Sequence, residues 1–183
     1  MPCIVNPSIL PDDVLLTDVR RFEDARGFFS ELYSQARLPE ALPLFVQDNV
    51  SLSTEAGVLR GLHFQTPPYA QGKLLTVIQG AILDVIVDLR SSSKTFGCAY
   101  AFELSSDNQK QLYVPEGFAH GFLTQVPHTL VHYKVTASYQ PTHDSGIAWN
   151  SPTLAIDWGL HAPPILSAKD AQLPPFHPEQ SYF

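Results

Sequence analysis

Residues 60–73 bring two cations and one imidazole into a span of fourteen residues. The imidazole belongs to His63, and histidine can take up a proton at cellular pH, so His63 is a candidate general base. A base of this kind needs a carboxylate that orients its ring, and the candidates are Asp84, Asp88 and Asp170. The cluster therefore predicts a site that moves protons.

Other side chains could complete such a site. Tyr133 carries a hydroxyl group on a strand-like run and could return the proton. Arg26, Arg60 and Lys169 could bind an anion, and guanidinium groups suit a diphosphate because each binds two oxygens in a fork. The chain itself is acidic, with a formal net charge of -7, which disfavours a nucleic-acid surface and favours a local anion site.

Short strands are the elements that must position these groups. Two apolar runs, residues 45–59 and 74–89, flank the histidine cluster. In the second run, the dipeptide Gln79-Gly80 predicts the tight turn of a hairpin between two arms rich in β-branched residues. Sixteen prolines argue against long helices, and one short helix is predicted at residues 35–42.

Alternation along the strands predicts which side chains share a face. Gln47 and Asn49 lie on one face of residues 44–53, and Tyr133 lies opposite His132 in residues 130–139. Roughly ten short strands with regular turn signals favour a small β-barrel or jelly roll. We therefore expect one all-β domain over residues 1–183, with short peripheral helices and a ligand-binding inner wall.

Composition disfavours several other classes of protein. No apolar run approaches the length of a membrane span, and no secretory leader is recognised. Cys3 and Cys98 are too few for a disulfide scaffold, and as free thiols they would fit a reducing compartment. The sequence therefore predicts a soluble cytoplasmic protein with no membrane or nucleic-acid partner.

One motif resembles the second sequence motif of the cupin superfamily: Pro115-x-Gly117-x-x-His120. Barrels of that superfamily usually hold a metal with a His-x-His pair, a glutamate and a later histidine. Here the pair would be His63-Phe64-Gln65, and Lys73 stands nearest to the glutamate position. Because an ammonium group would repel a divalent cation, we expect a cupin-like barrel without a metal.

Seven further motifs together carry a more specific resemblance. They are Asp24-x-Arg26-Gly27-Phe28-Phe29, Phe45-Val46-Gln47-Asp48-Asn49, Arg60-Gly61-Leu62-His63-Phe64-Gln65, Ala70-Gln71-x-Lys73, Val114-Pro115-Glu116-Gly117-Phe118-Ala119-His120-Gly121-Phe122, Tyr133-Lys134-x-Thr136 and Leu166-Ser167-x-Lys169-Asp170. From about Asp24 to Asp170, the chain resembles the dTDP-4-dehydrorhamnose 3,5-epimerase family.

The resemblance implies a homodimer of cupin-like jelly-roll barrels that needs no cofactor. It implies that His63, paired with Asp170, is the base and that Tyr133 is the acid on the opposite face of the sugar. Lys73 and His120 would lie near the carbonyl oxygen at carbon 4, where a cation and an imidazolium would stabilise an enolate.

The resemblance also implies contacts to the rest of the nucleotide diphosphate-sugar. The matching positions are Arg26, Glu31, Gln47, Asn49, Arg60 and Lys169. Asp144 falls where the family often has a glutamate. Tyr139 falls where an aromatic side chain commonly packs on the nucleotide base.

These residues predict an epimerase that inverts carbons 3 and 5 of dTDP-4-dehydro-6-deoxy-D-glucose. The product would be dTDP-4-dehydro-L-rhamnose, a precursor in dTDP-L-rhamnose biosynthesis, formed by proton abstraction and return through an enolate. Three alternatives stay open: a mono-epimerase acting at carbon 3 or carbon 5 only, a non-catalytic sugar-nucleotide binding barrel, and a metal-dependent cupin oxygenase. The incomplete His-x-His pair disfavours the last of these.

Overall fold

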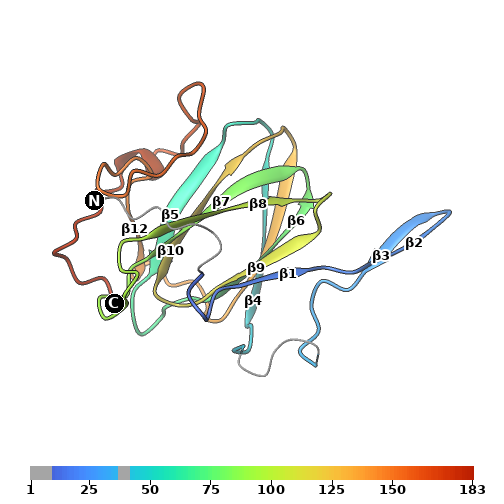
Figure 1. The fold of residues 1–183 in the computed structure, drawn as a ribbon, viewed down its shortest axis with the longest axis horizontal. Helices are drawn as coiled ribbons and strands as arrows, with labels where there is room; N and C mark the ends of the chain where they lie inside the picture. Colours follow the sequence, from blue (N-terminus) through green and yellow to red (C-terminus); the bar gives the residue numbers. More distant parts are fainter. Residues whose placement is uncertain (1–9, 37–41) are drawn as a thin grey trace.

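The computed structural model describes residues 10–36 and 42–183 of the chain. Two five-stranded antiparallel sheets face each other and form the body of the molecule (Figure 1). The first sheet has the order β1 (Leu15–Asp18), β9 (Lys110–Val114), β6 (Lys73–Gln79), β11 (Thr129–Val135) and β4 (Gln47–Ser53). The second has the order β12 (Asp144–Gly146), β5 (Leu59–Gln65), β10 (Phe118–Thr124), β7 (Ala81–Asp88) and β8 (Ala99–Ser105). The predicted all-β jelly-roll barrel is confirmed.

Alternation along the strands divides the apolar side chains between two clusters. On β7, Ile86 belongs to the cluster that both sheets enclose, whereas Val85 belongs to a second cluster beneath the C-terminal segment. Trp149 and Trp158 pack against this second cluster or within it, and the indole nitrogen of Trp158 donates to the carbonyl of Trp149. The C-terminal segment therefore covers the outer face of the second sheet and holds its own residues close to β5.

The predicted hairpin around Gly80 is wrong. The strands β6 and β7 do flank Gly80, but β6 pairs with β9 and β11, and β7 pairs with β8 and β10. Gly80 has a φ of 85°, and a Cβ atom there would lie 2.4 Å from the hydroxyl oxygen of Thr129. The dipeptide therefore forms the corner at which the chain crosses from one sheet to the other, which only glycine allows at so close an approach.

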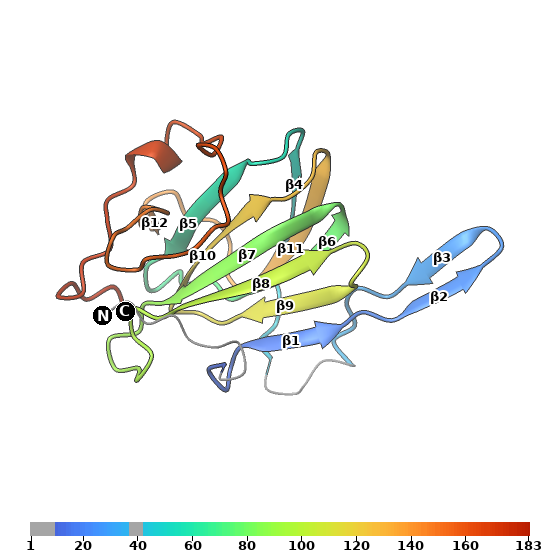
Figure 2. The ribbon, with the colours of Figure 1, turned by 45° about the horizontal axis from the view of Figure 1, so that its top comes forward.

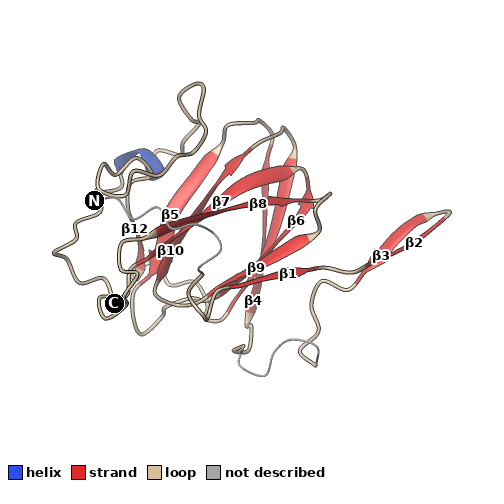
Figure 3. Ribbon diagram, viewed as in Figure 1, coloured by secondary structure: helices blue, strands red, loops and turns tan. Residues whose placement is uncertain are grey.

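Helix is confined to one short 3₁₀ turn among the described residues, η1 (Asp170–Gln172), coloured blue in Figure 3. Most of the helix predicted at residues 35–42 lies outside the described residues, and residues 35–36 form a turn. None of the described helical residues belongs to a span that is long and apolar enough to cross a bilayer.

The expectation of free thiols is wrong for Cys98. This residue is buried and disulfide-bonded, and Cys3 lies outside the described residues. The disulfide at residue 98 removes the support that a free thiol there would give to a reducing compartment.

A two-stranded hairpin, β2 (Arg21–Asp24) and β3 (Gly27–Ser30), stands away from the barrel in both views of the ribbon (Figures 1 and 2). Its side chains Phe28 and Phe29 are 56% and 68% exposed, so neither belongs to the core of its own barrel. The edge strand β4 carries a second exposed apolar pair, Val50 and Leu52. Grouped apolar side chains of this kind mark surfaces that another molecule covers.

Candidate active site

His63 on β5 and His120 on β10 stand directly opposite each other in the second sheet. A β-bulge follows this pair, because two residues of β5 oppose one residue of β10. A Cβ atom at Gly61 would lie 2.7 Å from the Cα atom of Gly121, so glycine is needed where the two strands approach most closely. The strand pairing and the bulge thus bring two imidazoles that are far apart in sequence to one wall of the barrel.

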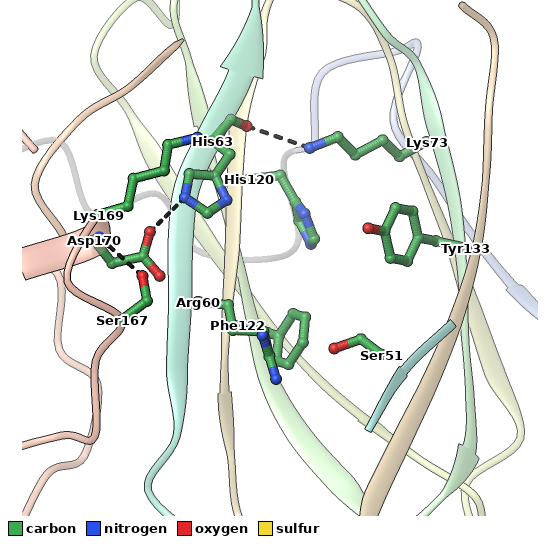
Figure 4. Close-up of a pocket in the computed structure, with 10 residues that line it drawn as sticks. All are labelled: Ser51, Arg60, His63, Lys73, His120, Phe122, Tyr133, Ser167, Lys169 and Asp170. Atoms are coloured by element: carbon green, nitrogen blue, oxygen red, sulfur yellow. Dashed lines mark hydrogen bonds and ion pairs between the residues drawn. The ribbon is translucent and has the colours of Figure 1, made fainter. Parts of the chain in front are cut away.

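The imidazole of His63 is held by a carboxylate from the C-terminal segment. Its Nε2 atom lies 2.6 Å from Oδ1 of Asp170, the first residue of η1 (Figure 4). Burial alone would raise the pKa of Asp170, but hydrogen bonds from His63, Ser167 and the backbone amide of Gly61 hold that pKa below its ordinary value. Asp170 is therefore ionised near neutral pH and is the carboxylate that orients His63.

Asp84 and Asp88, the other two candidates for that role, have different partners. Asp84 is fully buried, and its Oδ2 atom lies 2.7 Å from Nε2 of His120. Asp88 binds Arg90 instead, at the far end of β7. Burial lowers the pKa of His120, and the attraction of Asp84 opposes that shift without reversing it. The neutral ring is therefore favoured near neutral pH, in contrast to the imidazolium expected from the sequence.

Lys73 begins β6 of the first sheet and brings a positive charge across to the wall that carries the two histidines. Its Nζ atom donates a hydrogen bond of 3.3 Å to the backbone oxygen of His63, and only 8% of the residue is exposed. Burial lowers the pKa of Lys73 to about 8, and the charges of Asp84 and Asp144 act in the opposite direction. Near neutral pH the ammonium group is still mostly charged, and it acts in surroundings that screen charge poorly.

Tyr133 faces the histidines from the first sheet (Figure 4). It lies on β11 between Asn49 of β4 and Leu75 of β6. Burial raises the pKa of Tyr133, with Arg60 acting in the opposite direction, so the hydroxyl group keeps its proton near neutral pH. His63 and Tyr133 lie on opposite sides of a cavity of about 260 Å³. The prediction that His132 points to the other face of β11 is confirmed, since its ring bonds Asp48.

Three further side chains line this cavity without having been assigned to it from the sequence: Ser51, Phe122 and Ser167. Ser51 continues the alternation of residues 47 and 49 along β4, so the two-residue period of a strand could have identified it from the sequence. Phe122 lies two residues after His120 on β10 and shares its face for the same reason. The hydroxyl of Ser167 accepts the backbone N–H of Asp170, a contact that no strand pattern predicts.

A second cavity, of about 270 Å³, adjoins the first and shares lining residues with it. Its lining includes four predicted substrate contacts that do not line the first cavity: Gln47, Asn49, Tyr139 and Asp144. The carboxylate of Asp144 accepts hydrogen bonds from the hydroxyl of Tyr139, at 2.8 Å, and from the ammonium group of Lys169. The two cavities form one site with acid–base groups in the first part and polar and aromatic groups in the second.

The predicted anion-binding residues fall into two groups. Arg60 and Lys169 line the first cavity, where the guanidinium group of Arg60 also bonds the backbone oxygen of Leu52. Arg26 lies at the turn of the β2–β3 hairpin with its side chain 89% exposed and paired with Asp24. Neither Arg26 nor Glu31 lines either of these two cavities.

Metal-binding side chains do not gather in the part of the barrel that the structure describes. Within residues 10–36 and 42–183, no group of three or more His, Cys, Asp or Glu side chains is arranged to hold a metal ion. The position of the second histidine in the metal-binding pair is occupied by Gln65, whose amide bonds the backbone of the protein.

A double-sheet barrel with an imidazole–carboxylate pair, a buried lysine and a facing tyrosine defines an acid–base enzyme built on a cupin-like fold. The chain belongs to the dTDP-4-dehydrorhamnose 3,5-epimerase family, whose sequence profile matches residues 10–178.

Known members of this family are similar to the chain over nearly its full length. The dTDP-4-dehydrorhamnose 3,5-epimerase of Salmonella typhimurium is 45% identical over 174 residues, which is 93% of this chain and 94% of that protein. The crystal structure of the Bacillus anthracis enzyme, with TDP and PPi bound, superposes with a TM-score of 0.86 at 55% identity over 90% of this chain and 94% of its own. The Legionella pneumophila enzyme, in complex with dTDP-4-keto-L-rhamnose, has a TM-score of 0.85 at 39% identity over 95% and 98%.

Proposed function

We propose that this protein epimerises carbons 3 and 5 of dTDP-4-dehydro-6-deoxy-D-glucose to give dTDP-4-dehydro-L-rhamnose, in the pathway to dTDP-L-rhamnose. The observation that carries the proposal is the placement of a carboxylate-oriented imidazole, His63, across one cavity from a protonated phenol, Tyr133. Membership of the family supports the same substrate.

The chemistry that the cavity must promote is enolate formation. Carbons 3 and 5 both flank the carbonyl group at carbon 4, so removal of either proton leaves a negative charge on the carbonyl oxygen. The ammonium group of Lys73 is buried beside the backbone of His63, where it would stabilise that charge as it develops. His120 lies opposite His63 and would add a hydrogen bond to the same oxygen when its ring is protonated.

Inversion needs a base and an acid on opposite faces of the ring. In a gluco-configured chair the hydrogens on carbons 3 and 5 are both axial and lie on the same face, so one base can reach both. His63 would remove each proton, and Tyr133 would return a proton from the other face. Between the two inversions, His63 would release its proton to solvent and Tyr133 would regain one from solvent. The raised pKa of Tyr133 supports the role of acid, because the phenol is not ionised before it donates.

The second cavity suits the nucleotide part of the substrate. Arg60 and Lys169 carry the positive charge that a diphosphate requires, and both line the first cavity, with Lys169 lining the second as well. Gln47 and Asn49 offer amide groups along β4, and Tyr139 offers an aromatic ring that is 52% exposed and available for stacking on the base.

A second copy of the chain would complete the site. Arg26 and Glu31 match family positions that contact substrate, yet they lie away from the cavities of their own barrel. The β2–β3 hairpin carries Arg26 outward together with exposed apolar side chains, and β4 offers an exposed apolar row. We infer a homodimer in which the hairpin of each protomer reaches the other barrel and brings Arg26 to its diphosphate.

The test is conversion of the named substrate in the presence of a reductase that accepts only the rhamnose-configured product. The proposal predicts stoichiometric oxidation of the reductant and an L-rhamnose nucleotide. If the protein binds dTDP but the substrate is neither converted nor exchanged, the barrel is a binding protein. Inversion at one carbon alone would make it a mono-epimerase with the same residues, and loss of activity after dialysis against a chelator would point to the metal-dependent alternative.

We also propose that residues 1–183 act as one domain and that the protein is cytoplasmic. Limited proteolysis that released a stable fragment would overturn the first statement. Fractionation of the source cells against a cytoplasmic marker enzyme tests the second.

A further inference from the structure

Gln65 is a buried amide that lies two residues after His63 on β5, so both side chains belong to the same face of the strand. It is 3% exposed. Its Nε2 atom donates to the backbone oxygens of Tyr69, at 2.7 Å, and Ser138, at 3.3 Å. Its Oε1 atom accepts the backbone N–H of Gln140 at 2.7 Å. Both hydrogens and the oxygen of this amide are therefore engaged with the protein.

Two hydrogen bonds of Gln65 reach the neighbours of Tyr139 in the chain. One reaches Ser138, the residue before it, and the other reaches Gln140, the residue after it. The backbone N–H of Tyr139 itself donates to Oε1 of Gln47, at 3.2 Å. A further amide, Gln71, donates to the backbone oxygen of Ala137 at 2.7 Å. The segment that carries Tyr139 is thus fixed by side-chain amides, although it has no strand partner of its own among the described residues.

We propose that Gln65 is a positioning residue that holds Tyr139 in place to receive the nucleobase, and so sets the affinity for the nucleotide end of the substrate. This inference rests on the proposed function. Both N–H hydrogens of Gln65 and its oxygen already bond the protein, so Gln65 acts through the backbone on both sides of Tyr139. Because β5 carries both Gln65 and His63, it also links the position of the general base His63 to the position of the Tyr139 ring.

Only an amide meets the demand for two donated hydrogens and one acceptor at this position. An ionised carboxylate of the same size can accept the N–H of Gln140, but it cannot donate to the oxygens of Tyr69 or Ser138. A protonated carboxyl group regains one of the two donors. The variant Gln65→Glu therefore makes the position of Tyr139 depend on pH, which a residue that only fills space would not do.

The experiment measures the Kd for dTDP by calorimetry between pH 5.5 and 8.5, for native protein and Gln65→Glu. We expect the variant to bind about tenfold more weakly at high pH and to approach the native Kd as the pH falls, because burial raises the pKa of the introduced carboxyl group. With the full substrate at high pH, KM should rise by more than kcat falls. An equal Kd at every pH would overturn the inference.

A double-mutant cycle separates a positioning role from a general structural one. In the background of Tyr139→Ala, the change Gln65→Glu should have little further effect on the Kd, because the ring that it positions is gone. Additive losses in the cycle would contradict the inference. Thr129→Val is the matched control: it removes the buried hydrogen bond to Val126 at the other end of β11, and should lower the melting temperature without changing the Kd.

The binding of dTDP by native protein distinguishes a failure of this inference from a failure of the proposed function. If native protein fails to bind dTDP at all, the proposed function fails and takes the inference with it. If native protein binds dTDP and the pH-dependent loss is missing in Gln65→Glu, only the role of Gln65 is overturned.

Discussion

Nε2 of His63 lies 2.6 Å from Oδ1 of Asp170, although 107 residues separate the two along the chain. A carboxylate only accepts hydrogen bonds, so Nε2 of the neutral imidazole carries the hydrogen and donates it. The other ring nitrogen, Nδ1, is then left with its lone pair, which is the form that a general base requires. The contact therefore selects the tautomer as well as the orientation of the ring.

Asp170→Asn should lower kcat by about 10²-fold or more, with a much smaller change in KM. The amide can donate to Nε2 of His63 and would favour the tautomer with its hydrogen on Nδ1. Steady-state kinetics with the reductase-coupled assay measures the effect. Ser167→Ala removes the hydroxyl that accepts the N–H of Asp170 and bonds its carboxylate, but it leaves the carboxylate beside His63, so it should lose far less activity. Equal activity of Asp170→Asn and native protein would refute the orienting role.

Tyr133→Phe should separate proton removal from inversion. His63 would still remove a proton and could return a solvent-derived one to the same face, so exchange would continue with retention of configuration. The inverted product should fall by about 10²-fold or more, because the acid on the other face is missing. Proton NMR in deuterium oxide, combined with the product assay, gives both rates from one sample. Parallel loss of both rates would mean that Tyr133 serves some step other than reprotonation.

The pH dependence of exchange should report Lys73. Its pKa in the folded protein is about 8, and the charged form is the one that stabilises an enolate. Activity should therefore fall as the pH rises through about 8, with the loss caused by deprotonation of the ammonium group. Initial exchange rates from pH 6 to pH 10 measure this limb. A rate that stayed level up to pH 10 would show that the charge of Lys73 is not used.

The same lowered pKa of Lys73 predicts that the stability of the fold, unlike the activity, rises with pH. Folding lowers the pKa of Lys73 from 10.5 to about 8, so the charge destabilises the fold fully below pH 8, and this cost disappears between pH 8 and 10.5. Lys73→Met should therefore be inactive yet more stable at pH 7, by up to about 3 kcal/mol. Thermal unfolding at pH 7 and pH 10 checks this, and the advantage of the variant should shrink at the higher pH.

Arg26 offers a test of the proposed dimer. Arg26→Ala should raise KM by about tenfold or more through loss of a diphosphate contact. Mixing it with His63→Ala, after exchange of subunits, should restore activity, because each mixed dimer holds one barrel with an intact His63 and receives Arg26 from its partner. A mixture no more active than its components, despite confirmed mixed dimers, would contradict a site shared between protomers.

Local patterns predicted the inner wall of the barrel well. The alternation of Gln47 and Asn49 on β4, and of Tyr133 on β11, puts the right side chains inside because a strand has a period of two. The same rule could have added Ser51. These assignments need only the strand itself, so they are available from sequence.

Relations between distant segments were harder to predict. The dipeptide Gln79-Gly80 has the composition of a hairpin turn, but its partner strands belong to different sheets, and pairing of strands is decided by the whole barrel. From the residues alone, three carboxylates were equal candidates for His63. The family resemblance pointed to Asp170, and the fold of the C-terminal segment brings its carboxylate to the imidazole. The role of Gln65 was missed because its three bonds reach backbone groups that the motif does not contain.

The central claim is that His63 removes protons from both carbons beside the carbonyl group. The most direct measurement is proton NMR of dTDP-4-dehydro-6-deoxy-D-glucose in deuterium oxide with native protein and with His63→Ala. We predict deuterium at carbons 3 and 5 with native protein, and none with the variant, while the variant still binds dTDP. Exchange at both carbons by His63→Ala at the native rate would contradict the account.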